Sequence, residues 1–136
     1  MHRRDHIKFG KYVAKQTYIQ EMQRKNLERT LLADAAAELA VNWIGNNISV
    51  LPDRLEPAVD QYHRGLFHSA DLFRKIEEVK QKIRENPPKD WQVEILLIMT
   101  LSAYQSHIAL DSTTPMGVPD YDWLWRLLES FNRGGS

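Results

Sequence analysis

The stretch from Asp90 to Leu110 constrains the fold of this chain more than any other segment. On a helix its large apolar residues point in every direction, and a helix that is apolar all round lies in the centre of a bundle or in a membrane. These residues are Ile95, Leu96, Leu97, Ile98, Met99 and Leu101. Polar residues such as Glu94 and His107 interrupt the stretch before it reaches the ~18 uninterrupted apolar residues typical of a membrane span. The pattern therefore predicts that 91–110 is the central helix of a bundle, capped by Asp90.

The other segments are also typical of helices, and none shows the alternating pattern of a strand. Helical spacing of apolar residues, together with capping and stop signals, predicts helices over 5–25, 26–45, 53–85, 91–110 and 121–133. A chain of 136 residues can bury roughly two-thirds of its unfolded surface in one core. We therefore expect an all-α fold, a compact bundle of about five helices in a single domain, 1–136. A loop at 111–119 and a tail at 133–136 complete the predicted organisation.

Two of the predicted helices carry long apolar stripes. In 26–45 the stripe recurs every fourth residue and predicts the face that packs in the bundle. Its members are Leu27, Leu31, Ala35, Leu39 and Trp43. The stripe on 53–85 extends over about eight turns, longer than one small domain usually covers, and it predicts a homodimer interface. Its members are Val59, Tyr62, Leu66, Phe73, Ile76 and Ile83.

The chain contains no cysteine. Disulfides, thiolate zinc sites and cysteine nucleophiles are therefore excluded. Residues 1–15 are charged and lack the apolar run of a secretory signal. With no membrane span predicted either, we expect a cytoplasmic protein that does not bind a membrane.

Charge is distributed unevenly although the formal net charge is zero. Residues 1–30 carry eight bases and three acids, a balance of +5, so the remaining residues carry −5. Four of the bases are spaced 4, 3 and 4 residues apart, so a helix aligns them in one solvated stripe with Tyr12 interleaved. They are Arg4, Lys8, Lys11 and Lys15. Such a basic arm can meet phosphate, an acidic protein partner or the acidic body of the same chain.

Catalytic signatures are sparse. The sequence has no Gly-x-Ser-x-Gly elbow and no glycine-rich phosphate loop. Asp60 and His63 are three residues apart, and a carboxylate and an imidazole at that spacing can share a metal in a helical bundle. A complete site needs a second such pair, which the spacing of Glu94 and His107 does not supply. We therefore predict no enzyme activity, no metal and no cofactor, and keep a metal-dependent helical enzyme around Asp60 and His63 as an alternative.

Residues 32–48 loosely resemble a helix-turn-helix segment. Ala36, Leu39, Val41 and Ile48 suit the apolar positions of that pattern. Two residues depart from it, because Ala40 stands where the turn usually has glycine and Asn46 where an aliphatic residue is usually buried. The competing interpretation is one continuous helix that ends near Gly45. The resemblance implies nucleic-acid binding, which is the alternative function for this chain, through this segment or through the basic arm.

Aromatic residues gather in the last third of the chain. Trp123 and Trp125 point roughly 200° apart on a helix, so one of them is expected to face outwards as an interface anchor. The leading hypothesis is therefore a non-enzymatic helical interaction protein, an adaptor or inhibitor of the phage or plasmid accessory type, that docks on a protein partner as a homodimer. The candidate binding residues are Arg4, Lys8, Lys11, Lys15, Tyr12, Trp123 and Trp125.

Overall fold

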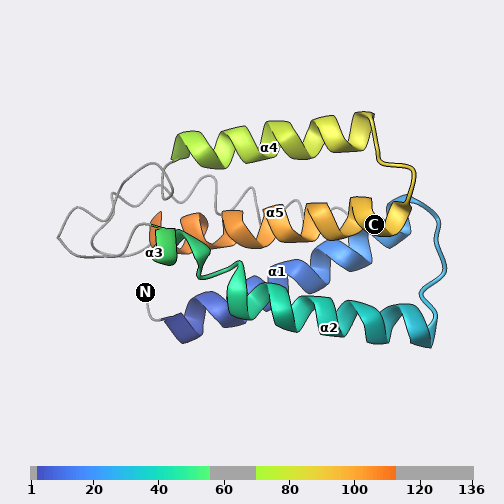
Figure 1. The fold of residues 1–136 in the computed structure, drawn as a ribbon, viewed down its shortest axis with the longest axis horizontal. Helices are drawn as coiled ribbons and strands as arrows, with labels where there is room; N and C mark the ends of the chain where they lie inside the picture. The colour runs from blue at the N-terminus through green and yellow to red at the C-terminus, as the bar shows by residue number, and fades with distance from the viewer. Residues whose placement is uncertain (1–2, 56–69, 113–136) are drawn as a thin grey trace.

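The computed structural model describes residues 3–55 and 70–112 of the chain. The predicted all-α class is confirmed, since 85% of these residues are helical and none lies in a strand. The helices are α1 (Arg3–Arg24), α2 (Leu31–Asn47), α3 (Leu51–Leu55), α4 (Ala70–Glu85) and α5 (Trp91–Ser112) (Figure 1). Since α3 is a short turn, the bundle has about four helices rather than five. The helix predicted at 121–133 lies outside the described residues.

The helix α5 is the centre of the described bundle, as predicted, because it packs against each of the other helices. It runs in the same direction as α2 and opposite to α1 and α4 (Figure 1). Asp90 caps it, as expected, because its Oδ1 accepts a hydrogen bond of 2.9 Å from the backbone N–H of Gln92. The main core cluster joins α1, α2 and α5. Its buried residues are Ala14, Tyr18, Met22, Ala37, Val41, Ile44, Ile95, Met99 and Ala103.

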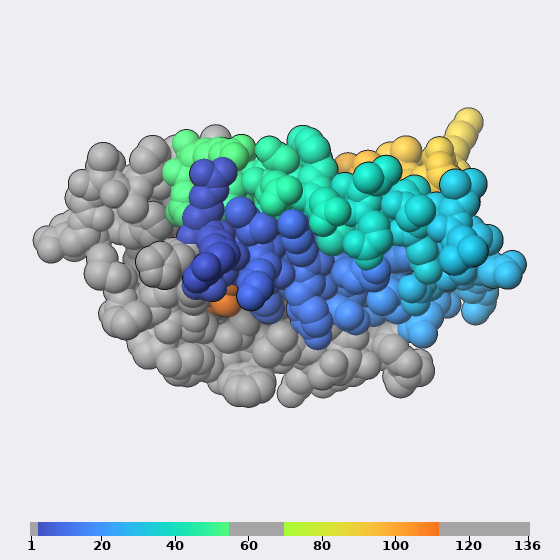
Figure 2. Space-filling model, turned by 90° about the horizontal axis from the view of Figure 1, so that it is seen from below, coloured from blue at the N-terminus to red at the C-terminus, as the bar shows by residue number. Residues whose placement is uncertain are grey.

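The packing face of α2 differs from the predicted one. Leu39 and Trp43 are 75% and 60% exposed, and Leu31 is exposed as well. The buried face consists instead of Ala37, Val41 and Ile44. Figure 2 shows α2 lying beside α1 with its outer face at the molecular surface. Small and β-branched side chains allow the backbones of neighbouring helices to approach closely, so this face packs in the bundle and the stripe of large residues remains outside.

The face of α4 that points inwards matches the predicted stripe. Phe73 and Ile76 are buried, and Phe73 belongs to a second cluster with Val13 and Ile108. Because α4 packs against α5, this part of the stripe is covered within the chain and is not available as a homodimer interface. The residues of the stripe between 57 and 69 lie outside the described ranges.

The apolar helix α5 also passes a length and composition test for a membrane span over Trp91–Asp111. Of its most apolar window, 61% is buried inside the bundle. A core helix passes the same test, so this finding agrees with the central position of α5. It was the only such segment found among the described residues.

Candidate functional site

An apolar groove of about 270 Å³ lies between α2 and α5. Alanines of α2 form one side, where their small side chains leave space, and larger residues of α5 form the other. The lining residues are Tyr18, Ala33, Ala36, Ala37, Ala40, Trp91, Gln92, Ile95, Leu96 and Met99. None of them is charged, so the groove offers an apolar surface with few polar groups to fix a ligand.

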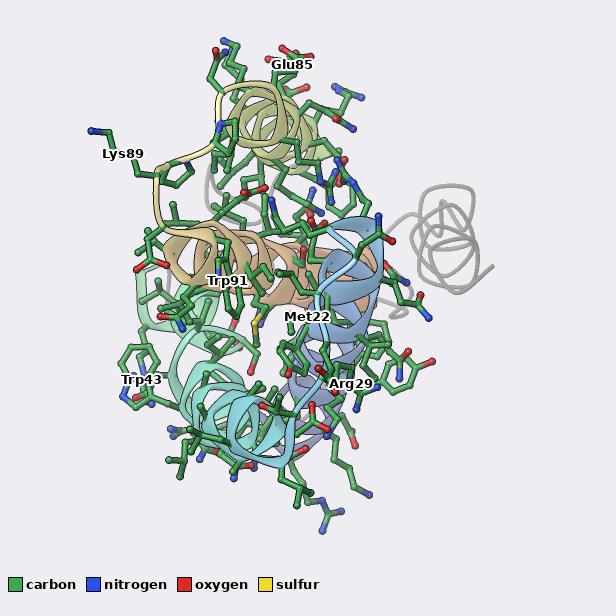
Figure 3. All side chains as sticks on the ribbon, turned by 90° about the vertical axis from the view of Figure 1, so that its right-hand side faces the viewer. Met22, Arg29, Trp43, Glu85, Lys89 and Trp91 are labelled. Atoms are coloured by element: carbon green, nitrogen blue, oxygen red, sulfur yellow. The ribbon has the colours of Figure 1, made fainter. Side chains whose placement is uncertain are left out.

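Large apolar side chains are exposed on both helices that form the groove. Leu32, Leu39 and Trp43 are exposed on α2, and Trp91 and Leu96, which line the groove, are exposed on α5. Trp43 points away from the bundle (Figure 3). Monomeric soluble proteins rarely expose large contiguous apolar patches, and those that do usually bind another protein or a membrane there. We call these exposed residues, together with the groove, the α2–α5 face.

Charges of both signs lie at one end of the α2–α5 face. Both α2 and α5 begin at this end (Figure 1), and a helix N-terminus carries a partial positive charge. Lys89, next to the start of α5, is exposed and projects from the bundle (Figure 3). Asp34 lies in the first turn of α2, Glu94 lies in the first turn of α5, and Asp90 caps α5. The groove is therefore uncharged along its length, and two helix N-termini lie at one end.

The basic stripe of α1 is only partly solvated. Arg4 and Lys8 are exposed, as expected, and so is the interleaved Tyr12. Lys15 forms an ion pair with Glu38 of α2. The aliphatic part of Lys11 packs so closely against Gly45 of α2 that a side chain at position 45 would collide with it. The expectation of one solvated stripe is therefore wrong for its second half, which packs within the chain.

The turn of a helix-turn-helix is absent from residues 32–48, because α2 is continuous from Leu31 to Asn47. Ala40 and Asn46, the two residues that depart from the pattern, both lie within this helix. Trp123 and Trp125 lie outside the described residues, as do Asp60 and His63. The resemblance to a helix-turn-helix is therefore wrong, and the basic stripe of α1 keeps Arg4 and Lys8 exposed.

A second site is buried at the other end of the bundle from the start of α5. His6 of α1 stacks on His107 of α5, with ring centroids 3.7 Å apart and planes at 12°. Asp111 of α5 contacts both rings: its Oδ1 is 3.1 Å from His6 Nε2 and its Oδ2 is 2.9 Å from His107 Nε2. Asp53 Oδ1 of α3 is 3.2 Å from the same His107 nitrogen. We call these four residues the His–Asp cluster.

The cluster depends on a close approach of α1 to the turn between α2 and α3. A Cβ added to Gly10 would lie 2.4 Å from Ser49 Cβ, so only glycine fits there. Ser49 O is 2.6 Å from Nδ1 of His107. His6 is one turn before Gly10 on the same helix, so this approach brings its ring to His107.

Charge interactions within the cluster are strong. Burial lowers the pKa of His107, but hydrogen bonds to Asp111 and Asp53 outweigh this effect and raise it from 6.5 to about 9. Burial raises the pKa of Asp111, yet hydrogen bonds with His107 and His6 hold it well below its usual range. In the absence of another cation, a charged imidazolium therefore lies between two carboxylates.

The sequence analysis missed the His–Asp cluster because its members come from three helices far apart in the chain. The available signal was the spacing of His107 and Asp111, which places both side chains on one face of the central helix. His6 and Asp53 have no such signal, because only the packing of α1 and α3 against α5 brings them close.

Comparison with known proteins found no matching family model, no matching curated protein and no matching solved structure.

Proposed function

We propose that this chain is a non-enzymatic interaction protein, an adaptor or inhibitor, that binds an amphipathic helix of a protein partner on the α2–α5 face. The observation that carries the proposal is the apolar groove with large exposed side chains on both sides. An exposed apolar surface of this kind costs free energy in water, and a partner that covers it recovers about 25 cal/mol per Å² of apolar area.

A helix is the occupant that fits the groove. Two helices that run in the same direction form its walls (Figure 1), and a third helix can pack along them. The alanines at 33, 36, 37 and 40 allow its backbone to approach closely, as small residues do at helix crossings. Their span corresponds to about two helical turns. The partner helix therefore needs large apolar residues at positions i, i+3 or i+4, and i+7.

Electrostatics favour one orientation of the partner helix. The positive N-terminal ends of α2 and α5 lie together, with Lys89 exposed beside them. The C-terminal end of a bound helix is partly negative, so it is most stable at this end. We therefore expect the partner helix to run antiparallel to α2 and α5.

Site-specific crosslinking tests this proposal. A photoreactive p-benzoylphenylalanine replaces Leu96, which is 47% exposed beside the groove, or Val79, which is 41% exposed on α4 outside the α2–α5 face and serves as the control. Crosslinking takes place in the cell that produces the protein, and mass spectrometry identifies the crosslinked peptide. The expected product joins position 96 to a segment of another protein that has the predicted apolar spacing.

A second pair of variants tests whether the crosslink forms in the groove. Ala36→Glu places a charge in the groove and should abolish the crosslink from position 96, whereas Asn42→Glu, an exposed position on the side of α2 away from the groove, should leave it intact. A crosslink to another copy of this chain would replace the proposed partner with self-association. A yield from position 96 no higher than from position 79 would contradict the proposal.

Cytoplasmic localisation and the absence of membrane binding belong to the same proposal. Nucleic-acid binding by the basic arm remains the alternative, and Arg4 and Lys8 of the basic stripe are exposed for it. Each phosphate contact would contribute about 0.9 to the slope of log affinity against log salt. The apolar groove has no role in such binding. The partner proposed here is therefore a protein.

A further inference from the structure

We propose that the His–Asp cluster is a binding site for one zinc ion. The ligands are Nε2 of His6, Nε2 of His107 and a carboxylate oxygen of Asp111, and Asp53 lies beside His107. The donor atoms of the first three lie within 4.8 Å of one another. This site is separate from the α2–α5 face and does not depend on the proposed function.

The distances between donor atoms are close to those around a single ion. His6 Nε2 and His107 Nε2 lie 3.1 Å and 2.9 Å from the oxygens of Asp111. Ligands held about 2.0–2.2 Å from a zinc ion in a tetrahedral site lie about 3.3–3.6 Å from one another. The two imidazole rings are stacked with planes at 12°, so zinc binding would require them to turn out of the stack until both Nε2 atoms point at the ion.

The tautomer of His107 matches that of a metal ligand. Its Nδ1 is 2.6 Å from the backbone oxygen of Ser49, which can only accept a hydrogen bond, so Nδ1 carries a proton. The other nitrogen, Nε2, faces oxygens of both carboxylates. A backbone carbonyl that holds the second nitrogen is the usual support of a metal-binding histidine.

His6 is buried beside the other donor atoms. Its side chain is 1% exposed, its ring lies against that of His107, and its Nε2 faces Asp111. Zinc at Nε2 would leave Nδ1, which has no hydrogen-bond partner among the described residues, as it is. The position of the His6 ring is therefore what supports the site.

The chemistry of the donors selects the ion. Imidazole nitrogens suit zinc and other first-row transition metals, whereas magnesium and calcium prefer oxygen ligands only. Two histidines and one carboxylate supply three ligands, and both histidines are buried. The ion would hold together α1 and α5, the two helices that supply these ligands.

The test begins with the untagged full chain, freed of metal by a chelator and then dialysed. Zinc is added in a calorimetric titration, and cobalt, which absorbs visible light in a tetrahedral site, is added in a parallel experiment. We expect one zinc ion per chain, a higher melting temperature with zinc, a tetrahedral cobalt spectrum and no competition from magnesium. A folded wild-type chain that binds neither metal would overturn the proposal, because the cluster would then hold only a proton.

Variants locate the site. Asp111→Asn and His6→Gln should each weaken zinc affinity by more than about tenfold, at least the loss caused by removing a supporting residue of a metal site. Asp71→Asn, which removes an exposed carboxylate on α4, should bind zinc like the wild type. Circular dichroism confirms that each variant is helical. Zinc affinity that is unchanged in folded Asp111→Asn and His6→Gln would place the ion elsewhere and overturn the proposal.

Discussion

The two halves of α5 contrast in an unexpected way. The N-terminal half is the more apolar, yet Trp91, Val93, Leu96 and Leu97 are exposed there. In the C-terminal half, polar residues are fully buried. They are Ser102, Gln105, Ser106 and His107. Apolar character along this helix therefore does not determine how deeply a residue is buried.

The contrast has a physical explanation in the neighbours of each half. Gln105 bonds to Lys80 and to the carbonyl of Phe73, and Ser106 bonds to the carbonyl of Ala103. Such bonds remove most of the cost of burial, whereas Ser102 Oγ has no partner among the described residues. In the N-terminal half, neighbouring helices cover only part of the circumference. In the function proposed above, its uncovered side serves binding, while its buried side and the second half serve stability.

The largest difference in the free energy of unfolding is expected between alanine substitutions at two adjacent residues of the apolar half. Ile98 is 0% exposed and Leu97 is 41% exposed. Ile98→Ala should lower the free energy of unfolding by about 2–5 kcal/mol, because it leaves a cavity in the core. Leu97→Ala should cost less than about 1 kcal/mol. Urea denaturation measures both, and equal losses would show that the exposed face is buried in solution.

In the buried half, stability should depend on pH in metal-free protein. The pKa of His107 rises from 6.5 to about 9 on folding. Its stabilisation is therefore fully present below about pH 6.5 and is lost as the pH rises through 9. The total is up to about 3 kcal/mol, shared with Asp53, Asp111 and His6 as one coupled group. Urea midpoints between pH 6 and pH 10, with chelator present, measure the decrease.

The matched variant for this profile is His107→Gln, which removes the titrating imidazole. Its stability should be lower near pH 6 and much less dependent on pH over the same window. A variant with the same slope as the wild type would show that other groups cause the decrease.

Replacing a glutamine by leucine in each half of α5 should give a smaller difference in stability. Gln105 accepts a hydrogen bond of 2.9 Å from the buried amine of Lys80 and donates one of 3.1 Å to Phe73 O. Gln105→Leu should cost about 1–3 kcal/mol, because both groups lose a partner. Gln92→Leu, at the exposed start of α5, should have almost no effect. Thermal melting compares the two, and a neutral Gln105→Leu would mean that water replaces the lost bonds.

The smallest effect on stability is expected at the α2–α5 face. Leu96→Glu should change the free energy of unfolding by no more than about 0.5 kcal/mol, since a half-exposed position tolerates a charge. Ile108→Glu, in the buried half, should prevent folding. If Leu96→Glu unfolds the chain as well, the face is part of the core and cannot be a free binding surface.

Much of the fold was predictable because it depends on local pattern. The boundaries of α1 and α5, the cap at Asp90 and the end of α4 before Asn86 follow from spacing and from capping residues, which act within a few positions. The candidate sites were less predictable from the sequence. The basic stripe was recognised by spacing, but only the contact between α1 and α2 shows that Lys15 is paired with Glu38.

The sequence by itself determined the helical class, the limits of α1 and α5 and the choice of α5 as the central helix, because these depend on the total apolar content and on short-range signals. The start of α2 at Leu31 rather than near residue 26 was not predicted. Only the tertiary structure decided which face of α2 is buried, since α2 has two apolar faces of similar strength and close helix approach selects the one with small side chains. It also decided the His–Asp cluster, because residues separated by about a hundred positions meet only when α1, α3 and α5 pack together.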